Sequence, residues 1–513
     1  MLNKYFLTFL LSYRMKPIIT IIILAGFMIT SCKKDFLVVT PETNLSSATF
    51  FKTEADFKQA VNGAYVPLRN IVNGPAYLMG EMHSDNTYYF RNILFGATDA
   101  SENIADFALP SSGGVTTNGN VTNQYRQDYQ IIARTNQILT TIDAVDFAAD
   151  SKNNLKGQAL FLRAYAYFEL VRYFGKVPLH LTPVTNRAQA TLPLTSVDSI
   201  YIQIVKDADA ASKLLLNKAK QEPGRITSGA AKTLLANAYI VQKKWALAEA
   251  LLKDVVTNDG YVLMPDYTDA FSGTTANKNN QESVFEVQFQ EGSAGYNGSI
   301  IYNFLPRPMT AAELQPITGV SNPQSLSGEG NNAPTPDIIA AYETGDKRKD
   351  ISIAYVTLSG SLRDNKVYPY IKKFAKPHSL FGNTGNNWPI YRYSEVLLFL
   401  AEALNEQGKA SEAATYLNQV RVRAGLAASA ATDLRDAIFK ERRVELAFEN
   451  KRWFDLVRSG TAIAVITAYG ARVKANPLNY YYPAGNVPPN NAFTNIKELY
   501  DLPADEGALS PYF

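Results

Sequence analysis

Two stretches of the chain can be laid over each other, LANAYIVQKKWALAEALLKDVV at residues 235–256 and LAEALNEQGKASEAATYLNQVR at residues 400–421. In each, a helix with small residues on one face is followed by a short turn and a second helix. Because small alanines let paired helices approach closely, each stretch predicts a helical hairpin of the tetratricopeptide kind. One such hairpin cannot bury its own apolar face, so the hairpins are expected to stack into one body.

The remaining sequence predicts more helices and one region of different character. Further helices are expected around residues 53–70, 124–142, 154–174, 197–217 and 433–457. Between about 261 and 387 Gly, Asn, Pro, Ser and Thr dominate, and short runs such as VFEVQF at 284–289 have the alternation of β-strands. We therefore predict a mainly α fold. Stacked tetratricopeptide-like hairpins at 45–260 and 388–475 would carry a loop-rich, irregular variable region at 261–387 with short strands.

The charge of the chain is balanced once its N-terminal leader is set aside. The formal charge of +3 comes from Lys4, Arg14 and Lys16, which share the leader with no acidic residue. A nucleic-acid partner would require a basic excess, so none is predicted. Three histidines and one cysteine in 513 residues offer no zinc pattern, and we predict neither a metal nor another cofactor. The 30 tyrosines suit sugar stacking and core packing equally.

The N-terminus has the order of an export signal. Lys16 precedes an apolar stretch at residues 18–29, and small residues then lead to Cys32, the sole cysteine. Twelve residues rise about 18 Å as a helix, too little for a bilayer core of roughly 30 Å, so cleavage is expected. The run ITSC resembles the lipobox of bacterial lipoproteins, which predicts a signal peptide at 1–31 and acylation of Cys32. The alternative is an ordinary signal peptide beside an unused thiol. Met15 begins a well-formed signal by itself, which indicates that translation starts there.

The densest motif is IFKERRVELAFENKRWFDL at residues 438–456. It places Glu441 and Glu445 one helical turn apart among several arginines. Glycosidases set their two carboxyls about 5–9.5 Å apart on opposite sides of a sugar in a cleft. Adjacent acids on one helix surrounded by arginines predict a buried ion network instead, and we predict no catalytic residue.

Several motifs in one order across the chain resemble the SusD/RagB family, the surface nutrient-binding lipoproteins of Bacteroidetes. The matching runs are CKKDFL at 32–37, FFKTEAD at 50–56, GAY at 63–65, ALFLRAY at 159–165, YFGKVP at 173–178, GRIT at 224–227, RYSEVLL at 392–398, RAG at 423–425 and the block at 441–456. The resemblance implies one SusD-like domain at 32–513, held on the outer membrane at the cell surface through the lipid on Cys32. It also implies a partner, a TonB-dependent outer-membrane barrel similar to SusC, which takes over captured oligosaccharide or peptide.

The family's motifs carry no ligand residues, so candidates follow from the physics of sugar binding, which uses aromatic platforms flanked by polar groups. The run HSDNTYYFR at 83–91 has that mixture in a loop-rich zone, with Tyr88 and Tyr89 as platforms. The side chains expected to hydrogen-bond sugar hydroxyls are Asp85, Asn86 and Arg91. The alternative is that these aromatics anchor the loop.

Tyr296 and Tyr302 in the variable region form a second candidate with the same alternative, whereas Trp388 is expected in the core. Three functions stay open: a glycan-capture subunit without catalysis, a surface glycoside hydrolase, and a helical scaffold for proteins only. The sequence has neither a Gly-x-Ser-x-Gly elbow nor a His-Glu-x-x-His pair, which favours capture over hydrolysis.

Overall fold

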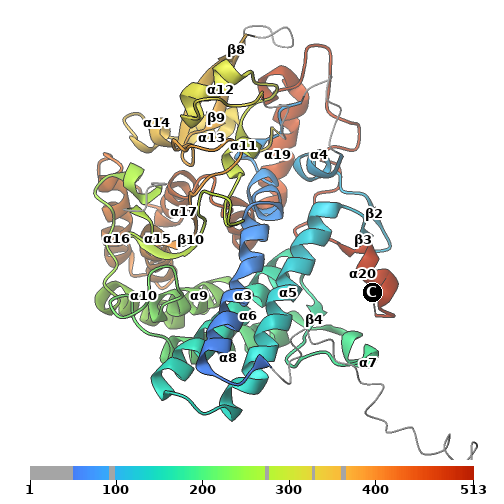
Figure 1. The fold of residues 1–513 in the computed structure, drawn as a ribbon. Helices are drawn as coiled ribbons and strands as arrows, with labels where there is room; N and C mark the ends of the chain where they lie inside the picture. The colour runs from blue at the N-terminus through green and yellow to red at the C-terminus, as the bar shows by residue number, and fades with distance from the viewer. Residues whose placement is uncertain (1–49, 92–98, 272–276, 326–329, 360–365, 513) are drawn as a thin grey trace, which may run out of the picture. The chain divides into compact units, whose positions relative to one another are not determined.

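The computed structural model describes residues 50–91, 99–271, 277–325, 330–359 and 366–512. The described residues from Thr53 onward belong to one compact unit (Figure 1). The predicted signal peptide and Cys32 lie outside the described residues. Among the helices that the structure describes, none combines the length and the apolar character needed to cross a membrane.

Four long helices form the first part of the unit. They are α3 (Glu54–Val72), α5 (Gly119–Thr141), α6 (Ala149–Phe174) and α8 (Val197–Leu214). Each packs on the next, α3 on α5, α5 on α6 and α6 on α8. Residues 157–171 of α6 are all buried, as its apolar and small residues predict, and α6 ends before Gly175, whose φ of 70° no longer fits a helix.

The two repeated stretches are helical hairpins, as predicted. The first is α9 (Ser228–Val241) with α10 (Trp245–Asn258), and the second is α15 (Tyr393–Asn405) with α16 (Ala410–Arg423). The hairpins stack through α10 and α15. The paired positions Leu252, Val255, Leu417 and Val420 are all fully buried, so the repeated apolar residues form the core between the helices. The mainly α fold is thereby confirmed.

The prediction of a single helix at 433–457 is wrong. This stretch forms two helices, α17 (Leu434–Glu445) and α18 (Arg452–Ser459), followed by α19 (Ala462–Ala475) and α20 (Ala504–Leu509). The helix is interrupted between α17 and α18 because Phe448 and Asn450 adopt left-handed backbone angles, with φ of 70° and 61°, which do not fit in an α-helix.

The region 261–387 contains short elements, which in Figure 1 gather mostly above the hairpins. The predicted strand at 284–289 is β6 (Ser283–Val287), which pairs antiparallel with β10 (Trp388–Arg392). A second antiparallel pair joins β8 (Ile353–Leu358) to β9 (Lys366–Ile371), with Ile353 opposite Ile371. Trp388 is buried, as predicted, and stacks on Phe374 with ring centroids 4.7 Å apart.

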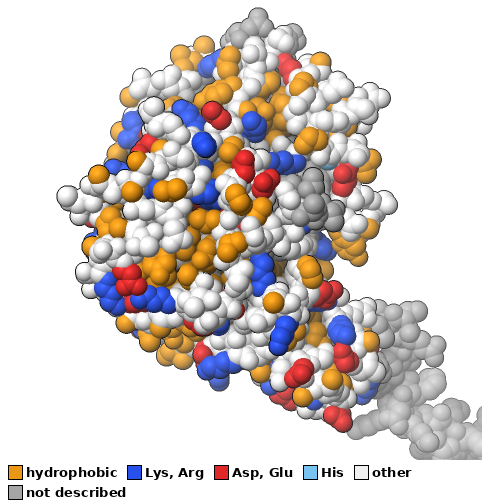
Figure 2. All heavy atoms as spheres, turned by 90° about the vertical axis from the view of Figure 1, so that its left-hand side faces the viewer, with side chains coloured by type: hydrophobic (Ala, Val, Ile, Leu, Met, Phe, Trp, Pro, Cys, Tyr) orange, Lys and Arg blue, Asp and Glu red, His pale blue; other side chains and the backbone are white. Residues whose placement is uncertain are grey.

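The other short elements complete the connections. They are η2 (Tyr77–Met82), β1 (Thr87–Tyr88), α4 (Asp99–Ala105), β2 (Ser111–Ser112), β3 (Val115–Thr116), η3 (Ile142–Ala144), β4 (Val177–Pro178), α7 (Arg187–Ala190), β5 (Leu194–Thr195), η4 (Tyr267–Phe271), α11 (Ile300–Phe304), α12 (Ala311–Thr318), β7 (Ala333–Pro334), α13 (Pro336–Ala341), α14 (Arg348–Ser352), η6 (Pro477–Tyr480) and β11 (Leu502–Pro503). On the face that carries α10, α14 and α16, basic and acidic side chains lie interspersed among hydrophobic and neutral ones (Figure 2).

Candidate functional site

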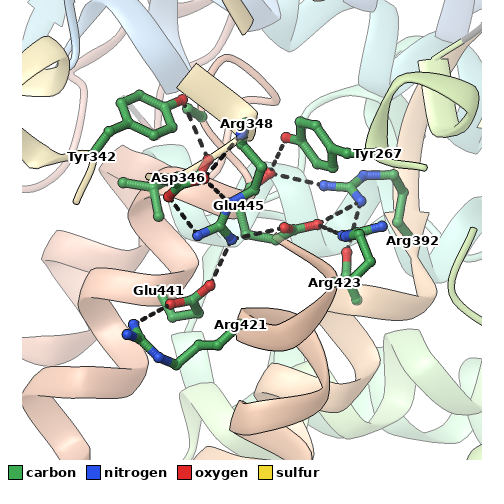
Figure 3. A network of polar contacts seen from close by, with 12 residues as sticks. Tyr267, Tyr342, Asp346, Arg348, Arg392, Arg421, Arg423, Glu441 and Glu445 are labelled. Atoms are coloured by element: carbon green, nitrogen blue, oxygen red, sulfur yellow. Dashed lines mark hydrogen bonds and ion pairs between the residues drawn. The ribbon is translucent and has the colours of Figure 1, made fainter. Parts of the chain in front are cut away.

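A buried network of charged side chains joins the variable region to the helices (Figure 3). Arg348, at the start of α14, donates from Nη1 to Glu441 Oε1 at 2.6 Å and to Glu445 Oε2 at 3.0 Å. Arg392, at the end of β10, and Arg423, at the end of α16, both donate to Glu445 Oε1, at 2.9 and 2.5 Å. The network therefore ties three separate parts of the chain to one face of α17.

The two glutamates of α17 are the ion network that the sequence predicts. All four of their carboxylate oxygens accept hydrogen bonds from arginines, since Arg421 donates to Glu441 Oε2 at 3.1 Å. Burial raises the pKa of Glu441 more than its arginines lower it. Burial would also raise the pKa of Glu445, but Arg423, Arg392 and Arg348 together hold that pKa well below its usual value. The two glutamates therefore anchor the arginines to α17, because all four carboxylate oxygens already accept hydrogen bonds within the fold.

A second junction fastens residues 77–91 to the loop between α17 and α18. The Glu81 carboxylate accepts the backbone N–H groups of Phe448 and Asn450, each at 3.0 Å, and the Asn86 side-chain amide at 3.1 Å. Burial raises the pKa of Glu81 to about 7 despite these donors. The carboxylate thereby holds the two left-handed residues in place.

Two of the predicted ligand residues, Asp85 and Asn86, belong to this junction. Arg452 Nε donates to Asp85 Oδ1 at 2.7 Å, and Arg443 Nη2 lies 2.9 Å from Asp85 Oδ2. Asn86 Oδ1 accepts from Arg443 Nε at 2.9 Å. Both side chains are buried, and the polar groups predicted for sugar hydroxyls are used within the fold.

The predicted platforms Tyr88 and Tyr89 are core residues, each 0% exposed. The Tyr88 hydroxyl donates to Asp106 and lies 2.9 Å from the Tyr482 hydroxyl. The Tyr89 hydroxyl accepts from Arg307, whose guanidinium carbon lies 4.9 Å from the Tyr89 ring centroid. A sugar could not reach either ring without displacing these neighbours. The stacking hypothesis for this pair is corrected accordingly, and the structure favours the alternative, in which the aromatics anchor the loop.

Arg91, the last residue of the segment at 83–91, is also paired within the fold. It pairs with Asp106 at 2.6 Å and with Glu102 at 3.1 Å, and its guanidinium carbon lies 4.4 Å from the Tyr482 ring centroid. These contacts leave the Arg91 side chain 12% exposed. Like its neighbours, Arg91 is held by the fold and is not presented to a ligand.

The second predicted pair, Tyr296 and Tyr302, consists of one buried and one exposed side chain. Tyr302 in α11 is buried, and its hydroxyl shares a hydrogen bond of 2.6 Å with His378 Nε2. Its ring meets Phe381 edge to face, with centroids 4.9 Å apart. Tyr296, by contrast, is 48% exposed. Of the seven ligand residues proposed from the sequence, Tyr296 is the one with an aromatic ring at the surface.

Tyr296 borders a groove of about 520 Å³. Its walls come from α3, from the loop at 222–225 and from the end of β6, so the groove lies where the variable region meets the first helices. The guanidinium carbon of Arg69, in the last turn of α3, lies 4.9 Å from the Tyr296 ring centroid. An aromatic ring flanked by polar side chains in a groove of this size suits a small polar ligand.

Part of the groove wall is built by a close approach of two loops. Gly224 has φ 86°, and a Cβ there would lie 2.9 Å from the side chain of Gln288. Arg225 donates to Asn62 Oδ1 at 3.0 Å and also pairs with Glu222. These contacts fix the loop at 222–225 against α3, so this part of the groove is preformed.

Arg69 is a residue that the sequence did not single out. It lies in an ordinary amphipathic helix, and its aromatic partner is far along the chain in a loop, so no local pattern connects them. The backbone N–H of Ser299 donates to Asn73 Oδ1 at 2.8 Å, which fastens the Tyr296 loop to the end of α3.

Two family models match this chain in succession. Residues 35–240 match the one described as starch-binding associating with outer membrane, and residues 345–510 match the one described as SusD family. The chain belongs to the SusD/RagB family. Among curated relatives, this SusD/RagB protein is 25% identical to SusD-like protein P25 of Formosa agariphila, over 87% of this chain and 90% of the relative.

Solved structures share the fold of this SusD/RagB protein. A laminarin-binding SusD-like protein superposes with a TM-score of 0.71 at 24% identity, covering 90% of this chain and 98% of that one. A SusD homolog from Bacteroides thetaiotaomicron gives a TM-score of 0.74 at 21% identity, covering 92% and 98%. At these identities the likeness establishes the arrangement of the helices and not the ligand.

Proposed function

We propose that this protein captures oligosaccharide at the cell surface and passes it to a SusC-like TonB-dependent barrel of the outer membrane. The observation that carries the proposal is the match of both the N-terminal and the C-terminal part of the chain to SusD-type family models, one of them described as starch-binding associating with outer membrane. A structural neighbour named for laminarin binding supports glycan as the class of ligand. The lipid on Cys32 would hold the protein at the membrane.

The ligand would bind in the groove beside Tyr296. Its ring is the predicted platform that remains exposed, and Arg69 and Asn62 supply hydrogen-bonding groups in the same groove. In contrast, the segment at 83–91 would serve as the support that joins the variable region to α17 and α18.

Binding would proceed without catalysis. The two carboxylates of α17, which a hydrolase would need in a cleft, are occupied by arginines. A general acid and a nucleophile must reach the glycosidic oxygen and the anomeric carbon of a sugar, and these side chains lie in the core.

A glycan array followed by isothermal titration and product analysis tests the proposal. We expect affinity for at least one oligosaccharide, recovered intact after prolonged incubation. Cleaved products would identify a hydrolase instead. A folded protein that binds no glycan but co-purifies with an outer-membrane barrel would identify a protein scaffold. Co-purification with the barrel that depends on Cys32 would support the membrane-bound arrangement. Complete absence of the protein from membranes would contradict that arrangement.

A further inference from the structure

Of the two arginines that line the Tyr296 groove, Arg69 lacks a counter-charge in the described part of the chain. Arg69 stacks on Tyr296, yet among the described residues no carboxylate lies within 4.0 Å of its guanidinium. The guanidinium of Arg69 lies against an exposed tyrosine ring and has no carboxylate partner among the described residues. It would therefore attract an anionic group of a ligand.

The other charges of the groove are already committed. Arg225 pairs with Glu222, and its Nη1 also donates to Asn62 and to Gln158 Oε1 at 3.3 Å. Glu286 accepts from the backbone N–H of Asn279 and from the Asn387 side-chain amide, each at 2.6 Å. Its negative charge interacts with Lys218 and Lys278: burial lowers the pKa of both lysines, and Glu286 acts against that shift. The positive charge of Arg69 is therefore the one that a ligand can meet.

We infer that the Tyr296 groove selects anionic glycans, whose sugars carry a carboxylate or a sulfate group that Arg69 binds. The inference rests on the proposed glycan-binding function and names its substrate class. A pyranose ring of the glycan would lie on the face of Tyr296 that is open to solvent, and the acidic substituent of a neighbouring sugar would reach past the edge of the ring to accept from the planar fork of Arg69. Guanidinium groups match carboxylate and sulfate oxygens in a bidentate manner, which a neutral hydroxymethyl group cannot reproduce.

Ligands that differ only in charge would test whether the groove prefers anionic glycans. Isothermal titration would compare an oligomer of galacturonic acid with its fully methyl-esterified counterpart, which has the same rings without the charges. A sulfated oligosaccharide and a neutral β-glucan oligomer form the other two arms, so the carboxylate and sulfate sources are distinguished. We expect an anionic oligomer to bind at least about tenfold more tightly than the neutral ones, the size of one charge-assisted hydrogen bond. Added salt should weaken that preference.

Variants assign the preference to the groove. Arg69→Gln should remove the preference for the anionic oligomer, and Arg69→Lys should keep part of it, because it retains the charge and loses the fork. Arg187→Gln is the matched control, since Arg187 is exposed on α7 and outside the groove. Circular dichroism would verify that each variant is folded.

Two results would overturn the inference. One is equal or tighter binding of the neutral oligomers by the wild type, which would leave the proposed glycan-binding function standing. The other is an anionic preference that survives in Arg69→Gln, which would place the recognition elsewhere. If the folded wild type binds none of these glycans nor any other on an array, the proposed function itself fails and the inference falls with it.

Discussion

Replacing Glu445 by glutamine should destabilise the protein strongly, because that carboxylate lies at the centre of the buried network. Glu445 is 0% exposed and accepts from Arg348, Arg392 and Arg423 at distances between 2.5 and 3.0 Å. Glutamine keeps the shape but removes the charge and turns an amide N–H₂ group toward guanidinium groups. Breaking a buried, hydrogen-bonded ion pair costs about 3–5 kcal/mol. We expect a loss of that size in the free energy of unfolding, measured by urea denaturation followed by circular dichroism.

The matched control is Asp209→Asn, which removes an exposed partner of Lys213 on α8. Pairs of that kind contribute about 0.3–0.5 kcal/mol, so this variant should unfold almost like the wild type. Because the pKa of Glu445 is depressed in the folded protein, its stabilisation is present above its ordinary pKa of 4.5 and is lost as the pH falls below that value. A change in Glu445→Gln below about 1 kcal/mol would refute the idea that the network anchors the variable region.

Further predictions concern other parts of the chain. Gly470→Ala should cost about 1–3 kcal/mol, because its Cβ would lie 2.5 Å from the Phe493 ring. Gly63→Ala in α3, where a Cβ would meet no described atom within 4 Å, should stabilise by about 0.5–1 kcal/mol. An unfolding midpoint of Gly470→Ala at or above that of the wild type would contradict the first expectation, and a midpoint of Gly63→Ala below that of the wild type would contradict the second. The pKa of Glu81 is raised from 4.5 to about 7, so between these pH values the folded chain binds more protons than the unfolded one. Stability should therefore decrease as the pH rises through that window, and a Glu81→Gln variant that kept the same slope would disprove this origin. Labelled palmitate should be incorporated into the wild type and not into Cys32→Ala; equal labelling of both would rule out lipidation at Cys32.

The helical scaffold could be predicted because its signals are local. Small residues at the crossing and larger ones at Leu252 and Leu417 recur at the same positions of both hairpins, and both pairs of helices formed. The ion network could also be predicted, since two acids on the apolar stripe of a helix must find positive partners when that stripe is buried. Arg348 and Arg392 could not be named as those partners, because they come from a short helix and a strand that are distant from α17 along the chain.

The break in the helix at 446–451 and the ligand residues depend on contacts that no local pattern contains. Phe448 takes its left-handed conformation where Glu81, 367 residues earlier, accepts its N–H. Tyr88 and Tyr296 both lie in loop-rich stretches with polar neighbours, so composition treats them alike. The difference is that Tyr482 and Asp106 cover Tyr88, whereas Tyr296, with Arg69 against its ring, stays 48% exposed. Exposure of an aromatic side chain in a loop is decided by tertiary packing.

The most direct measurement of the central claim is the affinity of Tyr296→Ala for the oligosaccharide that the wild type binds best. Its control is Tyr355→Ala, which removes another tyrosine, 54% exposed on β8 and outside the groove. Stacking on an aromatic ring contributes about 0.5–1.5 kcal/mol, so Tyr296→Ala should bind about two- to tenfold more weakly. The control should bind like the wild type, and the glycan should be recovered uncleaved. Unchanged affinity in folded Tyr296→Ala, or cleavage of the glycan by the wild type, would contradict the account.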